Sequence, residues 1–548
     1  MRSFFVTSLI AGSLAAGAWA AIPAANPASI QADVEFLADD RLEGRETGTR
    51  GHELAARYVA SQFARIGLRP GGDGGTFLQR VPLRSTQLVP DTSEFETTRH
   101  GVAERFKPGE DFFVPPGRHA DSSDASADAV YAGHGIVAPH LGVDDYARLD
   151  VKGRFVVVLA GSPPFLSGDE AAHFASPRLK QEVAAAHGAI GLITLQTPAN
   201  ELQFPFEQAL RTLQFRTFVW LDAAGQPHGG GTAVAHLATL SVAGAEKLLA
   251  RTGVSLADLV ARASRKLPPP AVEMAARIRI ARKSRLHEVS SANVVGVVEG
   301  ADPSVRHEQV VVTAHLDHLG MAAGRSGDTI YNGALDNATG VAVITEAARL
   351  IAALPSRPRR SIVFVAPTAE EAGLLGSEVF VHRAQAAGVA LVANLNIDMP
   401  ILTYNFRDIC AFGAEHSSLG ELVARVAASH GVSLSPDPKP ERRRFTRSDQ
   451  YAFVRAGIPA AFLNTGLHST TEDGAGQKAR EEVEQKHYHR VSDDTSLPIH
   501  YDAAARFASL GAAILVELAN APARPQWKAG NFFGETFGPS AATSRALP

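Results

Sequence analysis

The segment from about residue 290 to 520 alternates short apolar runs with longer amphipathic runs, and this alternation constrains the fold more than any other feature of the chain. The short runs predict strands and the longer runs predict helices. Several strands are apolar at nearly every position, which is typical of a sheet covered on both faces. The pattern therefore predicts an α/β fold with a mostly parallel, mixed sheet and helices on both faces. The expected strands are 293–298, 309–314, 361–366, 391–397 and 409–412, and the expected helices are 340–354, 374–387 and 419–430.

The segments before and after residues 290–520 have different sequence patterns. Residues 30–68 show two helical patterns separated by a polar turn, and Gly67 follows the second as a C-cap would. Residues 125–270 mix short strands with helices and end in a run of prolines. We therefore expect a main domain of residues 21–124 and 271–520, an inserted α/β or β-rich domain of residues 125–270, and a C-terminal tail of residues 521–548.

The N-terminus resembles an export signal. Arg2 precedes an apolar run, residues 4–14, that is too short for a membrane span of about twenty residues. Residues 18–20 (AWA) then fit the small-x-small rule for signal cleavage. We expect a signal peptide of residues 1–20 and a periplasmic or secreted protein without stable membrane insertion after cleavage. A membrane anchor is the alternative.

Composition excludes several classes of protein. The chain has 548 residues, which corresponds to roughly two to four domains. Its 53 basic and 57 acidic residues give a net charge of -4, whereas nucleic-acid binders usually carry a strongly basic face. Cys410 is the single cysteine, so a disulfide framework and a cysteine-rich zinc site are excluded. The 20 histidines leave a metal site of histidines and carboxylates open.

Ligand-type side chains follow the expected strands where those strands end. His315 and Asp317 come after strand 309–314, and their spacing of two places them on the same side of an extended chain. In open α/β sheets, ligands bind beyond the carboxyl ends of the strands, so separate segments are expected to meet there. The other members of the set are Asp336 in a turn, Glu370 and Glu371 after strand 361–366, Asp398 after strand 391–397, and His489 in a polar loop.

Each of these residues alone has an ordinary structural explanation. Adjacent glutamates are usually solvated, Asp336 could cap a helix, and a single loop histidine is usually exposed. The joint pattern favours a metal site, because buried carboxylates are costly unless they are paired or bind a metal. Oxygen and imidazole ligands suit zinc and also cobalt or manganese, so the residue types leave the metal open.

Five motifs make the chain similar to a known family. In order and spacing they resemble the zinc aminopeptidase family that contains the bacterial leucyl aminopeptidases and the glutamate carboxypeptidase II group. The motifs are 314–320 (AHLDHLG), 332–340 (NGALDNATG), 370–377 (EEAGLLGS), 396–399 (NIDM), and 488–489 (YH) with 493–495 (DDT). The insert resembles a protease-associated domain through residues 131–136 (YAGHGI).

This resemblance implies a two-zinc site on a zinc exopeptidase-like fold. His315 and Asp398 would hold the first zinc ion, Glu371 and His489 the second, and Asp336 would bridge both. Glu370 would be the general base, and Asp317, also expected to be catalytic, would lie behind the metal ligands beside His315. Asp449 and Tyr451 would lie near the substrate pocket. Family members also have a non-proline cis peptide bond after the bridging aspartate, here between Asp336 and Asn337.

The expected function is that of an exported exopeptidase that removes N-terminal amino acids from peptides. Two zinc ions that share a carboxylate and a hydroxide would polarise the scissile carbonyl, and Glu370 would take the proton of the attacking water. A carboxypeptidase or amidohydrolase on the same scaffold stays open, since the three arginines at 442–444 could bind a substrate carboxylate. A glutaminyl cyclase, which works with one zinc ion, and a non-catalytic binding protein are further alternatives that the complete ligand set disfavours.

Overall fold

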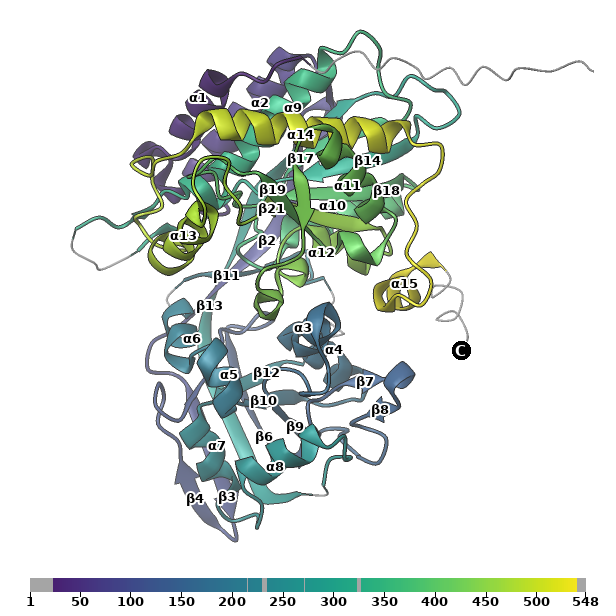
Figure 1. Ribbon diagram of the computed structural model, residues 1–548. Helices are drawn as coiled ribbons and strands as arrows, with labels where there is room; N and C mark the ends of the chain where they lie inside the picture. Colours follow the sequence, from purple (N-terminus) through teal and green to yellow (C-terminus); the bar gives the residue numbers. More distant parts are fainter. Residues whose placement is uncertain (1–22, 214, 229–233, 271, 323–326, 540–548) are drawn as a thin grey trace, which may run out of the picture.

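The computed structural model describes residues 23–213, 215–228, 234–270, 272–322 and 327–539. The expected signal peptide, residues 1–20, lies outside these ranges. Figure 1 shows two lobes, and the long strand β13 (Glu273–Val298) runs from the lower lobe into the upper one. Within the described residues, no helix is long and apolar enough to cross a lipid bilayer.

The upper lobe contains the predicted mixed sheet. Its strand order is β11–β2–β13–β17–β14–β18–β21–β19–β20. The central strands β17, β14, β18 and β21 are parallel, and β13 and β19 flank them in the antiparallel sense. The strands are β2 (Leu78–Leu88), β11 (Thr217–Trp220), β14 (Glu308–Thr313), β17 (Ser361–Ala366), β18 (Ala390–Ile397), β19 (Asp408–Phe412), β20 (Ser433–Ser435) and β21 (Ala460–Thr465).

Helices cover both faces of this sheet, as the apolar strands predict. Every residue of β17 is buried, and its side chains alternate between two cores. Ile362 and Phe364 pack in the core with α9 and α14, whereas Val363 and Val365 face α10 and α12. The helices are α1 (Pro27–Leu37), α2 (Arg50–Ile66), α9 (Thr339–Ala352), α11 (Leu419–Ser429) and α14 (Tyr501–Asn520) on one face, and α10 (Leu375–Ala386) and α12 (Gln450–Arg455) on the other.

The lower lobe has a second sheet and helices of its own (Figure 1). Its strand order is β4–β3–β13–β6–β9–β10–β12–β5. The strands are β3 (Glu94–Arg99), β4 (Val102–Arg105), β5 (Phe112–Phe113), β6 (Ser122–Tyr131), β9 (Phe155–Leu159), β10 (Gly191–Leu195) and β12 (His236–Leu240), and the helices are α3 (Gly168–Ala175), α4 (Pro177–Ala186), α5 (Pro198–Gln203), α6 (Phe206–Thr212), α7 (Val242–Leu249) and α8 (Leu256–Ser264).

The lobes do not coincide with the boundaries expected from the sequence. Strands β3, β4 and β5 precede residue 125 but belong to the lower sheet, which also includes the N-terminal half of β13. In the opposite direction, β11 lies within the expected insert but pairs with β2 of the upper sheet. The expected boundaries followed composition, whereas pairing between distant segments decides which lobe a strand joins.

Much of the expected tail is part of the upper lobe. Its helix α15 (Phe532–Phe537) buries Phe533. The indole Nε1 of Trp527 donates a hydrogen bond to the carbonyl oxygen of Gly457 at 2.9 Å. Residues 521–539 therefore pack against the fold, because their scattered aromatic side chains have apolar surface to bury.

Candidate metal centre

Two neighbouring parallel strands deliver the first group of ligand-type side chains. β14 leads into His315, and β18 leads into Asp398. The Nε2 atom of His315 lies 3.1 Å from Oδ1 of Asp398 and 3.2 Å from Oδ1 of Asp336. The ligand atoms of these three residues lie within 4.8 Å of one another, close enough to share one metal ion.

A second group lies on the other side of Asp336. The Oδ2 atom of Asp336 is 3.4 Å from Nε2 of His489, and this nitrogen is 3.2 Å from Oε2 of Glu371. Glu371 follows β17, the parallel neighbour of β14, and His489 lies in the loop before α14. Asp336 thus offers one carboxylate oxygen to each group, which is the arrangement of a bridging ligand.

The chemistry of these donors fits two zinc-type ions. Two atoms that are each 2.0–2.1 Å from a tetrahedral zinc ion lie roughly 3.3 Å apart. A neutral imidazole has a single N–H, so Nε2 of His315 cannot satisfy both carboxylates that approach it by hydrogen bonds. Burial alone would raise the pKa of Asp336, but His315 and His489 hold it well below its usual range. The carboxylate is therefore ionised, as a metal ligand must be.

The turn that carries Asp336 is held by its own contacts. The Asp336–Asn337 peptide bond is cis, which confirms the expectation from the family resemblance. The backbone N–H groups of Leu335 and Asp336 donate to the carboxylate of Asp493 at 2.8 and 3.0 Å. Only glycine fits at position 340, because a Cβ atom on this residue would lie 2.0 Å from Oδ1 of Asn337. These contacts fix the direction of the Asp336 carboxylate.

Glu370 lies beside this centre and lines the cavity above it. Burial raises its pKa well above the usual value for a glutamate, and the charges of Asp398 and Glu371 raise it further against the opposing effect of His315. A higher pKa makes the carboxylate a stronger base. By contrast, although burial alone would raise the pKa of Glu371, the adjacent His489 helps to bring it down to about 2.

Asp317 lies beside His315, as the resemblance implied, but its carboxylate has other partners. His315 uses the backbone carbonyl of Asp317, 3.1 Å from its Nδ1, as its partner. The Asp317 carboxylate instead accepts hydrogen bonds from the backbone N–H groups of Glu370, at 3.1 Å, and Glu371, at 3.3 Å. Asp317 therefore positions the two glutamates and does not support His315 through its side chain.

The two residues expected near the substrate are placed differently from each other. Asp449 is fully buried, accepts a hydrogen bond from Ser377 and does not line the cavity. It lies close enough to Glu370 for its charge to raise the pKa of that residue. Tyr451 does line the cavity, and its hydroxyl is 2.6 Å from Nδ1 of His173 in the lower lobe.

Sequence reasoning assigned no role to two residues that hold the ligands. Nδ1 of the fully buried His318 lies 2.8 Å from Oε1 of Glu371 and so orients that carboxylate. Buried Arg45 donates to four backbone carbonyls, those of Leu37, Leu316, Asn332 and Gly333. It thereby ties the N-terminal segment to the loops that carry His315 and Asp336. His318 lies in the motif of residues 314–320, which is the signal that could have found it.

Comparison with known families agrees with this geometry. Residues 293–515, which include every residue of the two groups, match the sequence model of Peptidase family M28. This segment is a family M28 peptidase domain. It contains β14, β17 and β18 and begins near the C-terminal end of β13.

Individual relatives match only part of this chain. Aminopeptidase NAALADL1 of Mus musculus is 31% identical over 134 residues, which are 23% of this chain and 16% of that protein. The alkaline phosphatase isozyme conversion protein of Escherichia coli (strain K12) is 26% identical over 209 residues, 35% of this chain and 59% of that protein. The chain thus spans less than two thirds of the length of these relatives.

A solved structure extends the similarity to both lobes. The aminopeptidase from Aneurinibacillus sp. strain AM-1 superposes with a TM-score of 0.51 and covers 91% of this chain and 95% of that chain. The sequences are 18% identical, so this similarity establishes the fold. The zinc exopeptidase-like architecture that the sequence resemblance implied is confirmed.

The lower lobe covers the metal centre of the M28 domain. A cavity of about 770 Å³ reaches from His315, Asp336 and Glu370 to residues of the lower lobe, among them Lys180 and Phe206. Hydrogen bonds and ion pairs between the two lobes lie beside this cavity. His173 forms a hydrogen bond with Tyr451. Arg178 forms an ion pair with Glu378, and Arg455 forms one with Glu182 at 3.1 Å. A substrate must therefore enter between the lobes.

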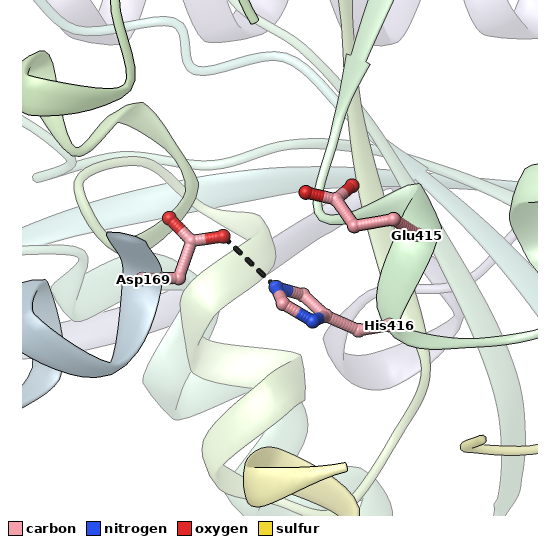
Figure 2. A group of neighbouring side chains, drawn as sticks. All are labelled: Asp169, Glu415 and His416. Carbon is pink, nitrogen blue, oxygen red and sulfur yellow. Dashed lines mark hydrogen bonds and ion pairs between the residues drawn. The ribbon is translucent and has the colours of Figure 1, made fainter. Parts of the chain in front are cut away.

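A further cluster between the lobes, shown in Figure 2, consists of Asp169, Glu415 and His416. The hydrogen bonds of His416 argue against a metal ion there. Oδ1 of Asn531 accepts from the N–H groups of Phe533 and Gly534, so its amide nitrogen faces Nδ1 of His416 at 2.9 Å. Nδ1 is then an acceptor, and Nε2 must carry the proton that it donates to Asp169 at 2.9 Å. The cluster is a further hydrogen-bonded contact between the two lobes.

Proposed function

We propose that this protein is an aminopeptidase that uses two zinc ions to remove N-terminal residues from peptides. The observation that carries the proposal is the division of the Asp336 carboxylate between two histidine–carboxylate pairs, with Glu370 facing the same cavity. His315 and Asp398 would hold one ion, His489 and Glu371 the other, and Asp336 both. When bound, two zinc ions polarise the scissile carbonyl and lower the pKa of the attacking water.

The side chains of the site account for the remaining chemistry. Glu370 accepts a proton from the water whose oxygen bonds to the carbonyl carbon, and it returns that proton to the amide nitrogen as the C–N bond breaks. Asp317 holds Glu370 and Glu371 in place through their backbone N–H groups. The carboxylates beside the zinc ions would also attract the ammonium group of a substrate with a free N-terminus.

The likeness in fold to an aminopeptidase and the M28 match support the free-amine specificity. Hydrolysis of leucyl-4-nitroanilide by the zinc-loaded protein tests it, with N-acetyl-leucyl-4-nitroanilide as the matched blocked substrate. We expect kcat/KM for the free amine to be higher by at least about tenfold, since a charge-assisted hydrogen bond contributes roughly 1.5–3 kcal/mol. Faster cleavage of the blocked compound would refute the proposal.

We also propose that the protein is exported and acts in the periplasm or outside the cell. The support is the signal-like pattern of residues 1–20. Sequencing the N-terminus of protein recovered from the periplasm or medium should give a start near Ala21. An intact Met1 in the membrane fraction would contradict the proposal.

A further inference from the structure

The cavity wall beyond the metal centre is strongly cationic. Among the described lining residues outside the centre there are eight arginines and lysines but only two carboxylates, Glu378 and Glu484. Both carboxylates are already engaged. Glu378 pairs with Arg178, and Glu484 pairs with Arg444 and, at 3.0 Å, with Lys439. Glu182 and Asp437, which do not line the cavity, pair with Arg178, Arg455 and Arg444, but positive charge remains in excess on this wall.

Arg442, Arg443 and Arg447 are the least satisfied of these cations. Their side chains line the cavity and make no hydrogen bond or ion pair with any described residue, whereas the adjacent Arg444 pairs with Asp437 as well as with Glu484. Arg443 is half-buried, and this burial lowers its pKa. A partly desolvated guanidinium without an anion gains more from binding a carboxylate than a solvated one does.

Lys180 of the lower lobe adds a third charge beside Arg443. Its side chain is buried, and Nζ donates to the carbonyl oxygens of Leu159 at 2.7 Å and Gly161 at 2.6 Å. The pKa of Lys180 is lowered to about 7, mainly by burial; the charge of Asp145 opposes this shift, and the positive charge of Arg443 contributes to it. An ammonium group has three donors, so one remains for a ligand in the cavity.

The size of the cavity limits what this charge can bind. A volume of about 770 Å³ lies in the range of small-molecule pockets, roughly 300–1,000 Å³. The lower lobe covers part of the cavity, so a short peptide fits and a folded protein does not. When the N-terminal residue of such a peptide is at the metal centre, its far end lies within the same cavity.

We propose that Arg442, Arg443 and Lys180, the cationic wall, bind a carboxylate at the far end of the substrate, so that this enzyme prefers short peptides with a free C-terminus. This inference rests on the proposed aminopeptidase function and names its substrate class. The bidentate geometry of guanidinium suits a carboxylate. The carboxylate could instead belong to an acidic side chain, and the substrate series separates these two sources.

The test compares leucyl peptides of two to about six residues, each as the free acid and as the C-terminal amide. For the best length, the acid should have a kcat/KM about 10–100-fold above the amide, as expected for a hydrogen bond to a charged group. Amides that carry glutamate at successive positions form the second arm. If these match the free acids, the wall recognises an acidic side chain, and the proposal for the C-terminus is overturned.

Arg443→Gln is the variant that tests the assignment to the wall. It should reduce the acid-to-amide ratio at least about fivefold, towards one, mainly through a higher KM for the acid. Arg442→Gln provides a second variant if the first folds poorly, as judged by circular dichroism and zinc content. Arg425→Gln is the matched control. Arg425 lies on α11 and pairs with Glu517 at 2.7 Å, so the ratio should not change.

Failure of this inference is distinguishable from failure of the proposed function. Normal hydrolysis of leucyl-4-nitroanilide together with an acid-to-amide ratio near one in the wild type would overturn the cationic wall and leave the aminopeptidase intact. Release of C-terminal residues from N-acetylated peptides, without hydrolysis of free-amine substrates, would overturn the proposed function and with it this inference.

Discussion

Glu370 and Glu371 show how two adjacent residues of one type acquire opposite properties. The same Asp317 carboxylate holds both backbones, but Glu371 meets His489 and His318 while Glu370 faces the cavity. The pKa of Glu371 is thereby lowered to about 2, and that of Glu370 is raised by burial and by neighbouring carboxylates. One is suited to bind metal and the other to accept a proton.

Replacing these two glutamates separately should therefore give different defects. Glu370→Gln should keep the fold and both metal ions but lower kcat by at least about 10²–10⁴-fold, because glutamine cannot accept the proton of water. Glu371→Gln, an equally conservative change, should lower the metal content. Steady-state kinetics and elemental analysis on the same samples measure both effects. Near-normal kcat of Glu370→Gln at full metal loading would remove Glu370 as the base.

At the residue scale, sequence reasoning grouped the ligand-type side chains because they end parallel strands or lie in family motifs. The structure brings together His315, Asp336, Glu371, Asp398 and His489. Sequence reasoning placed Asp317 beside His315 but did not reveal that its carboxylate accepts a hydrogen bond from the backbone of Glu370. Asp449 shows the same limit, since motif matching gives proximity to the pocket but not burial.

Among the elements, the parallel strands of the upper sheet were the most predictable. β17 matches the expected strand 361–366 at both ends, because a run that is apolar at five of its six positions has few other solutions. β13 was predicted only at its C-terminal end, as 293–298. Its earlier part alternates charged and apolar residues, and its partners β2, β3 and β6 are distant in sequence, so its length depends on pairing that local patterns do not contain.

The first helix contains a carboxylate that makes stability depend on pH. Asp33 of α1 is 8% exposed and accepts a hydrogen bond from the Tyr58 hydroxyl of α2 at 2.7 Å. Burial raises its pKa from 3.8 to about 6. The folded state thus binds this proton more tightly than the unfolded chain, so the stability that it contributes is complete below about pH 4 and is lost as the pH rises through 6.

Asp33→Asn should remove this loss while keeping an oxygen for Tyr58. We expect the variant to gain stability relative to the wild type, with a gain about 1–2 kcal/mol larger at pH 7.5 than at pH 4.5. Urea unfolding at the two pH values measures the difference. Asp128→Asn, at a carboxylate that is 70% exposed, is the control and should change by less than about 0.5 kcal/mol at either pH. A gain that does not depend on pH would exclude titration of Asp33 as the cause.

At the scale of the whole molecule, the site lies where the two lobes meet. The M28 domain supplies the metal ligands and Glu370, and the lower lobe supplies Lys180 and the roof of the cavity. Several contacts between the lobes join residues 200 or more positions apart, as Asp169 and His416 or His173 and Tyr451 do. No local pattern predicts such pairs, which is why the sequence indicated the metal ligands but not the cavity between the lobes.

The central claim is that two metal ions share Asp336, and anomalous diffraction at the zinc edge tests it most directly. Crystals of the zinc-loaded protein should show two anomalous peaks. One should lie beside His315 and Asp398 and the other beside Glu371 and His489, each about 2.0–2.2 Å from a different oxygen of Asp336. A single peak, or two peaks of which one does not contact Asp336, would contradict the account.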